Sequence, residues 1–240
     1  SDYARASRTV SIGDGLPVGM WRTDLVRQFR QEPLHELCSA AHLRGQKVIV
    51  ALPYEAHAEG SFSATTFNTG MRPVVEFLED LCLLAVERED YFIIVRGKRN
   101  NWVADERFKE AVERISTIGN MSISLNYLDA HEAYRLCAGA DAIVAKQSSL
   151  VDELLACGIP CVIHDYTSNC QDYSRNMVPY LPREIWAESP GELRQRITFA
   201  LRDHGESFRR WWEPTRAQLY GEWADGCVRQ RARQIMTSLI

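Results

Sequence analysis

The sequence predicts an α/β fold built on a doubly wound, mostly parallel sheet. Six short apolar runs alternate with segments in which apolar residues recur at helical spacing. The predicted strands are Lys47–Leu52, Tyr91–Val95, Met121–Leu125, Ala142–Ala145, Cys161–Ile163 and Ile185–Ala187. Strands that alternate with helices in this way are typical of βαβ units, whose strands run parallel.

The segments between these runs predict helices with recognisable start and stop residues. Ser189 is a good N-cap before Pro190, and Gly158 ends the helix that begins at Leu150. The other helices are expected over residues 22–30, 33–42, 73–89, 105–115 and 131–140 and from Phe208 onward, and a further short strand over 10–12. We therefore divide the chain into a linker segment with helices (1–46), the sheet domain (47–205) and a C-terminal helical tail (206–240).

The composition bounds the class of protein. The chain has 240 residues, of which 45% are hydrophobic and 25% charged, so it is expected to be a soluble globular protein with a sizeable core. The net charge of −4 gives no global basic field, and no nucleic-acid partner is expected. The seven cysteines form no C-x-x-C pair, which argues for a reducing compartment and against a zinc site.

No stretch reaches the length of a transmembrane helix, and no signal peptide is visible. We therefore expect a cytoplasmic protein, with a peripheral position at the inner face of the membrane as a further expectation. The abrupt start at Ser1 suggests a fragment of a longer protein.

Two hydroxyls lie between the fourth predicted strand and the helix that follows it. Ser148 or Ser149 would cap this helix, whose first backbone N–H groups and dipole face outward. In open α/β sheets, this end of a helix at the carboxyl edge of a parallel strand is where phosphate binds. The alternative is that Ser148 and Ser149 are only a cap.

The same stretch carries the spacing Glu153-x-x-x-x-Gly158-x-Pro160. This spacing resembles the donor-binding signature of GT-B glycosyltransferases, whose halves have Rossmann-like folds. The resemblance implies that Glu153 holds the ribose hydroxyls of a nucleotide-activated donor and that Ser148 and Ser149 hold its diphosphate.

Other segments are similar to the CDP-glycerol glycerophosphotransferase-like branch of that group. Gly15-Leu16-Pro17 and Arg22-Thr23-Asp24 resemble an element that crosses between the two halves in that family, with four extra residues between them. The family carries an Arg and a His after the second strand. This sequence keeps Arg96 but has Gly97-Lys98 where the His is expected, so the resemblance implies that Arg96 and Lys98 neutralise phosphate by charge. A solvated basic turn is the alternative.

Further donor contacts are implied by position in the same family. Asp165, with Tyr166 or Tyr173, resembles an Asp and a Tyr that follow its last central strand. Tyr127 lies in a turn that often contacts the nucleotide base in GT-B proteins; a Tyr of the core or rim is the alternative.

The segment from Tyr54 to Gly70 is a long loop after the first predicted strand, so it should overhang the same edge. Its candidate contacts are Glu55, His57, Glu59, Thr65 and Thr66. His57 and Glu55 are the candidates for a catalytic base if a second GT-B half, outside this sequence, does not supply one. A solvated loop without a catalytic role is the alternative.

The resemblance implies the donor-binding half of an enzyme that transfers a glycosyl or glycerophosphate group to a bacterial surface polysaccharide such as a capsule. The partners expected are a nucleotide-activated sugar or polyol, a carbohydrate acceptor, and an N-terminal GT-B half or partner subunit. No cofactor or metal is expected, since basic groups would stabilise the leaving diphosphate. Two alternatives stay open: a non-catalytic nucleotide(-sugar) binding or regulatory module, and a related two-domain sugar epimerase.

The predicted tail contains Trp211, Trp212 and Trp223. They pack within this domain or form a docking face for the missing half or another subunit, and the sequence favours neither.

Overall fold

The computed structural model describes residues 20, 22–53, 72–97, 101–126, 128–129, 131–146, 148–165, 180–221 and 224–238. The predicted strand over 10–12, Gly15-Leu16-Pro17, the loop from Tyr54 to Gly70 and Trp223 lie outside these ranges.

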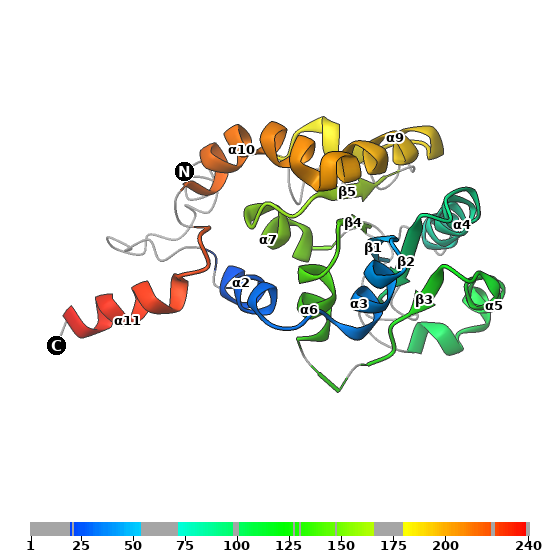
Figure 1. The fold of residues 1–240 in the computed structure, drawn as a ribbon, viewed down its shortest axis with the longest axis horizontal. Coiled ribbons are helices and arrows are strands. Elements are labelled where there is room, and N and C mark those ends of the chain that lie inside the picture. The colour runs from blue at the N-terminus through cyan, green and yellow to red at the C-terminus, as the bar shows by residue number, and fades with distance from the viewer. Residues whose placement is uncertain are drawn as a thin grey trace, which may run out of the picture.

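One six-stranded sheet, parallel throughout, organises the chain (Figure 1). Its strands are β1 (Lys47–Leu52), β2 (Tyr91–Val95), β3 (Met121–Ile123), β4 (Ala142–Ala145), β5 (Cys161–His164) and β6 (Trp186–Ala187). They lie in the order β3-β2-β1-β4-β5-β6. All residues of β2, β4 and β5 are buried, which explains why these strands are continuous apolar runs in the sequence. The predicted doubly wound parallel sheet is confirmed.

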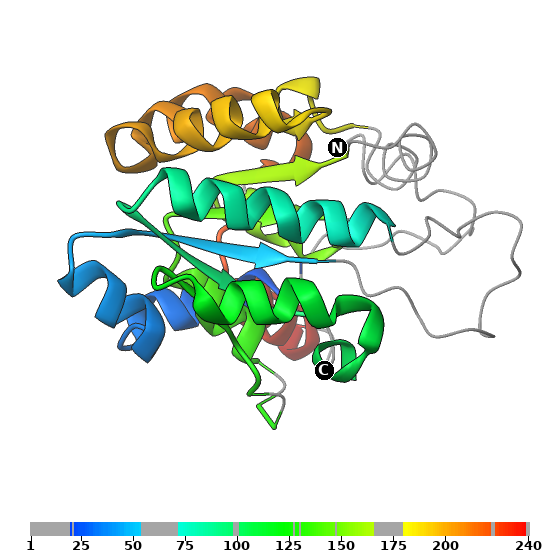
Figure 2. The same cartoon turned by 90° about the vertical axis from the view of Figure 1, so that its right-hand side faces the viewer.

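Helices cover both faces of the sheet (Figures 1 and 2). Their bounds are α2 (Thr23–Gln31), α3 (Glu36–Leu43), α4 (Arg72–Glu87), α5 (Lys109–Thr117), α6 (Glu132–Ala138), α7 (Leu150–Ala156), α9 (Pro190–Leu201), α10 (Glu206–Tyr220) and α11 (Val228–Ser238). Helices α4, α5 and α9 pack on one face, while α2, α3, α6 and α7 pack on the other. Short 3₁₀ segments run over Asn101–Ala104, Glu106–Phe108, Arg183–Ile185 and Arg202–Gly205.

The strand order reverses between β1 and β4. From β1 the chain moves outward through β2 to β3, and it then returns to β4 and moves outward through β5 to β6. Because β1 and β4 are direct neighbours, with Leu52 opposite Ala145, the connections that leave them diverge at the centre of the sheet. Ligands of doubly wound sheets bind in the crevice at this switch point.

Several predicted elements differ from the structure at their boundaries, and in four of them a local feature accounts for the difference. Helix α3 begins at Glu36 rather than at Pro33, because His35 is its N-cap and its Nδ1 accepts the backbone N–H of Leu37. Strand β3 ends at Ile123, where its pairing with β2 ends. The segment 105–108 forms a 3₁₀ turn ahead of α5, and another 3₁₀ turn shortens the last strand to Trp186–Ala187.

Side chains from two other helices hold the C-terminal end of α7. The last carbonyls of a helix have no partner within the helix. Here the Leu155 carbonyl accepts the indole N–H of Trp212 at 2.8 Å, and the Ala156 and Cys157 carbonyls accept from Arg216 and Arg30 at 3.4 and 3.3 Å. Gly158 then leaves the helix with a φ of +72°, a conformation that favours glycine.

The C-terminal tail therefore packs against the sheet domain along α10. Trp212 is fully buried, and Trp211 lies half-buried against the core. Helix α11 extends away from the sheet, and Val228 is its buried residue (Figure 1). Asp24 of α2 accepts the backbone N–H groups of Val228 and Arg229, each at 2.8 Å, and so caps α11 from another helix.

We predict that Trp212→Phe lowers the free energy of unfolding by about 1–3 kcal/mol, because a buried carbonyl loses its donor and the smaller ring leaves a void. Urea denaturation would measure the change. Trp211→Phe at the half-buried neighbouring position is the matched control and should cost less. Equal losses for the two variants would contradict the proposed support of α7.

Candidate functional site

The carboxyl ends of the central strands gather buried charged and polar side chains at one edge of the sheet. Arg96 follows β2, Lys146 follows β4, His164 ends β5 and Asp165 follows it; all four are buried. Parallel strands bring these positions to the same edge (Figure 2). Burying ionisable groups is costly unless other polar groups surround them, so their concentration here identifies the candidate site.

Arg96 lies one strand away from the switch point. Its backbone N–H donates to the Ala51 carbonyl at 2.8 Å, and its guanidinium donates to the hydroxyl and the carbonyl of Ser124 at 3.3 and 3.5 Å. The structure thus places a buried guanidinium at the predicted edge. Its binding to phosphate stays a prediction.

Lys146, His164 and Asp80 form a continuous polar chain across β4, β5 and α4. Lys146 Nζ lies 3.4 Å from His164 Nδ1, and His164 Nε2 lies 3.3 Å from Asp80 Oδ2. Burial lowers the pKa of His164 from its ordinary value; the hydrogen bond to Asp80 opposes this shift, and the charge of Lys146 adds to it. The lowered pKa favours the neutral imidazole, whose Nδ1 can accept from the ammonium while its Nε2–H donates to Asp80.

The two serines before α7 differ in their contacts. Ser148 is half-buried and its hydroxyl accepts the Leu150 N–H at 3.3 Å. Ser149 is the residue before the helix, but it is exposed and its side chain makes no capping bond. The predicted cap is therefore made by Ser148 and not by Ser149, whose helical φ of −63° and ψ of −19° differ from the extended backbone of a usual N-cap. Phosphate binding by either serine stays a prediction.

Glu153 faces α6 and the start of α2. Its Oε2 accepts the Tyr134 hydroxyl at 2.5 Å, and its Oε1 lies 3.5 Å from Arg22 Nη1. The side chain is 13% exposed, so these partners orient it while one part still meets solvent. Burial raises the pKa of Glu153, and the bonds from Tyr134 and Arg22 oppose the shift. A carboxylate has about four acceptor positions, so this geometry is compatible with further donors such as ribose hydroxyls.

The remaining predicted site residues have separate outcomes. Asp165 is buried at the carboxyl edge, and its backbone N–H donates to the Ala187 carbonyl at 2.8 Å. Glu55, His57, Lys98 and Tyr127, together with Tyr166 and Tyr173, lie outside the described residues. Their proposed roles stay predictions.

Four residues near the site have no role predicted from the sequence: Lys146, His164, Asp80 and Tyr134. Lys146 had a signal, since it is one of four lysines in the chain and directly follows an apolar strand. His164 also ends an apolar run. Nothing in the sequence indicated Asp80 or Tyr134. Helical spacing shows which residues share a face of a helix, but it does not show that Asp80 lies beside β5 or that Tyr134 lies beside α7.

The described ranges hold no group of three or more His, Cys, Asp or Glu side chains arranged to bind a metal ion. Metal-independent chemistry stays a prediction. Of the helices in the same ranges, none combines the length and apolar character needed to cross a membrane.

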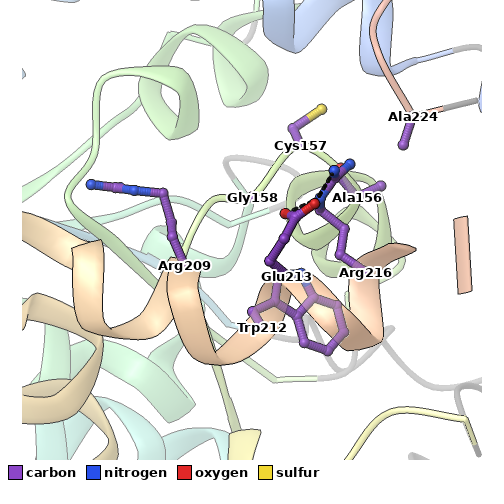
Figure 3. Close-up of a pocket in the computed structure, with 8 residues that line it drawn as sticks. All are labelled: Ala156, Cys157, Gly158, Arg209, Trp212, Glu213, Arg216 and Ala224. Carbon is purple, nitrogen blue, oxygen red and sulfur yellow. Dashed lines mark hydrogen bonds and ion pairs between the residues drawn. The ribbon is translucent and has the colours of Figure 1, made fainter. Parts of the chain in front are cut away.

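A pocket of about 240 Å³ lies at the C-terminal end of α7, away from Ser148 and Ser149 at its N-terminal end (Figure 3). It is lined by Ala156, Cys157, Gly158, Arg209, Trp212, Glu213, Arg216 and Ala224. Glu213 pairs with Arg216 at 2.6 Å, whereas Arg209 points away from this pair and binds Glu206. The pocket borders the residues that precede β5, so it is separate from the carboxyl-edge site.

Comparison with known proteins identifies the fold. No protein-family model matches the chain, and no curated protein matches it significantly. Among solved structures, the wall teichoic acid polymerase TagF is similar over 93% of this chain and 51% of its own, with 14% identity and a TM-score of 0.54. A variant of that polymerase soaked with CDPG gives 14% identity, coverages of 93% and 50%, and a TM-score of 0.56.

A putative UDP-N-acetylglucosamine 2-epimerase from Listeria monocytogenes is similar over 92% of this chain and 52% of its own, with 15% identity and a TM-score of 0.59. These likenesses confirm the predicted doubly wound, Rossmann-like fold. The chain spans about half the length of these structures.

We predict that Glu153→Gln becomes more stable relative to the wild type as pH rises from 4 to 7. The pKa of Glu153 is raised in the folded state, so its contribution to the free energy of unfolding is full below the unfolded pKa. In the wild type this contribution is lost as pH rises through the folded pKa, whereas a glutamine does not titrate. Urea denaturation at both pH values would measure the difference.

Glu87 provides a control of opposite sign. The hydrogen bond from Arg194 lowers the pKa of Glu87. The contribution of Glu87 to the free energy of unfolding is therefore present above the unfolded pKa and is lost as pH falls through the folded pKa. A difference between Glu153→Gln and the wild type that stays constant over the pH range would contradict the described environment of Glu153.

Proposed function

We propose that this chain is the donor-binding half of an enzyme that transfers a glycosyl or glycerophosphate group from a nucleotide-activated donor to a cell-surface polysaccharide. The observation that supports this most is the set of buried charged and polar groups at the carboxyl edge, next to the switch point between β1 and β4. Doubly wound sheets bind nucleotides at this location.

In this proposal the site stabilises the diphosphate that leaves during transfer. Arg96, Lys98 and the hydroxyls of Ser148 and Ser149 bind phosphate oxygens, and Glu153 binds the ribose. Such groups are fixed before the reaction, so they stabilise developing negative charge without reorganising. Tyr127 and Asp165 complete the donor contacts, and no metal is required.

The acceptor is a carbohydrate, and its catalytic base comes from a second half or partner subunit or, within this chain, from His57 or Glu55. This chain covers about half of each matched structure, and this supports an enzyme built from two such parts. We place the enzyme in the cytoplasm, at the inner face of the membrane.

A sugar epimerase is the second candidate. The putative UDP-N-acetylglucosamine 2-epimerase has a TM-score of 0.59, against 0.54 for TagF, so the fold favours neither activity. An epimerase would convert its nucleotide sugar without an acceptor, whereas a transferase would release nucleotide only when an acceptor is present. A non-catalytic binding module would do neither.

We predict that one of CMP, CDP, UDP, GDP and ADP raises the melting temperature of the protein. At about one hundred times its dissociation constant, a ligand adds roughly 2.7 kcal/mol, which corresponds to roughly 5–10 °C for a chain of this length. Glu153→Ala should remove most of the shift, because the ribose loses its acceptor. The exposed Glu113 on α5 provides the control variant Glu113→Ala, which should keep the shift.

The same panel applied to the full-length protein tests whether the site needs a second half. The absence of a shift with every nucleotide in the full-length protein would contradict the proposed donor site.

A further inference from the structure

Lys146 lies directly at the point where the strand order reverses. Its backbone N–H donates to the Leu52 carbonyl at 3.0 Å, which extends the pairing of β4 with β1 by one residue. The divergence of the connections at this point opens the crevice in which doubly wound sheets bind ligands. Lys146 is therefore a cation placed at the centre of the candidate site.

The register of the sheet fixes the face on which Lys146 lies. Ala145 is opposite Ile163, so the next residues, Lys146 and His164, form the next row and share a face. Their separation of 3.4 Å agrees with this. Arg96 is level with the preceding row, and its guanidinium binds Ser124 instead. The edge thus presents cations from both faces of the sheet.

His164 and Asp80 hold the ammonium in place. Both Lys146 and His164 are 1% exposed, and the Phe77 ring packs edge-on against the imidazole with 4.8 Å between centroids. The neutral imidazole accepts from Lys146 on one side and donates to the Asp80 carboxylate on the other. An ammonium carries three N–H donors in addition to its charge, which suits it to recognise the oxygens of a diphosphate.

We propose that Lys146 binds the diphosphate of the donor at the switch point, and that His164 and Asp80 are positioning residues for its ammonium. This inference rests on the proposed donor site and adds the cation that recognises the diphosphate. A desolvated cation held before the ligand arrives interacts more strongly with phosphate than a solvated one does.

Lys146→Met tests the proposal in the full-length protein. Isothermal titration calorimetry would measure the binding of UDP, CDP and inorganic pyrophosphate, with uridine and cytidine as phosphate-free ligands. We expect a loss of about 10- to 100-fold in affinity for the phosphate ligands, as for a charged hydrogen bond, and little change for the nucleosides.

Lys47→Met is the matched control. Lys47 is a half-buried lysine at the amino end of β1, in the same sheet but at the opposite edge, and its Nζ lies 3.4 Å from the Leu201 carbonyl. The affinity of this variant for the phosphate ligands should stay within about twofold of that of the wild type, because Lys47 does not contact the ligand.

Two substitutions separate positioning from a structural role. His164→Asn keeps an acceptor near the place of Nδ1, whereas His164→Leu removes it. We expect the leucine variant to lose preference for UDP over uridine, or CDP over cytidine, and the asparagine variant to restore it. Equal preferences in the two variants would overturn the positioning role.

A measurement on the wild type keeps the proposal testable if Lys146→Met does not fold. The Nζ resonance of Lys146, in protein labelled with ¹⁵N-lysine, should shift on addition of pyrophosphate, while that of Lys47 stays unchanged. Diphosphate binding that depends on Glu153 but leaves Lys146 unaffected would overturn this inference and leave the proposed function standing. No binding of nucleotide or pyrophosphate by the wild type would overturn both.

Discussion

The parallel pairing of the strands is the constraint on which the site depends. It brings the carboxyl ends of β1, β2, β4 and β5 to one edge, so groups from distant parts of the sequence meet there. The reversal of strand order between β1 and β4 then selects the centre of that edge. Arg96, Lys146, His164 and Asp165 lie at or directly after strand ends, and their burial follows from the same geometry.

Helix α7 depends on the surrounding helices because it has only seven residues. Its C-terminal carbonyls accept bonds from α10 and α2, while its acidic residues bind tyrosines from other helices. Asp152 is buried with the Tyr220 hydroxyl 2.5 Å from its carboxylate, and burial raises the pKa of Asp152. The ionised form of this group is therefore disfavoured by burial. The arrangement fixes the turn that carries Ser148 and orients Glu153 toward α6.

The sequence predicted the central strands well because β1, β2, β4 and β5 are buried apolar runs with no competing interpretation. It could not decide between Ser148 and Ser149 as the cap of α7, because the helical φ and ψ of Ser149 cannot be deduced from residue type. It also gave no sign of contacts between elements. Asp80 and His164 are 84 positions apart, and only the packing of α4 on the sheet brings them together. The resemblance to GT-B proteins predicted the fold correctly, whereas the roles of Glu153 and Arg96 still depend on binding data.

The most direct test of the account is a titration of the isotope-labelled protein with UDP and CDP, followed through backbone amide resonances. A donor site at the carboxyl edge predicts shifts at Gly97, Ser148 and Asp165, with Gly45 and Gly158 at the opposite edge unchanged. Shifts concentrated around Gly158 and the pocket between α7 and α10 would contradict it, because they would place the ligand at the wrong edge of the sheet.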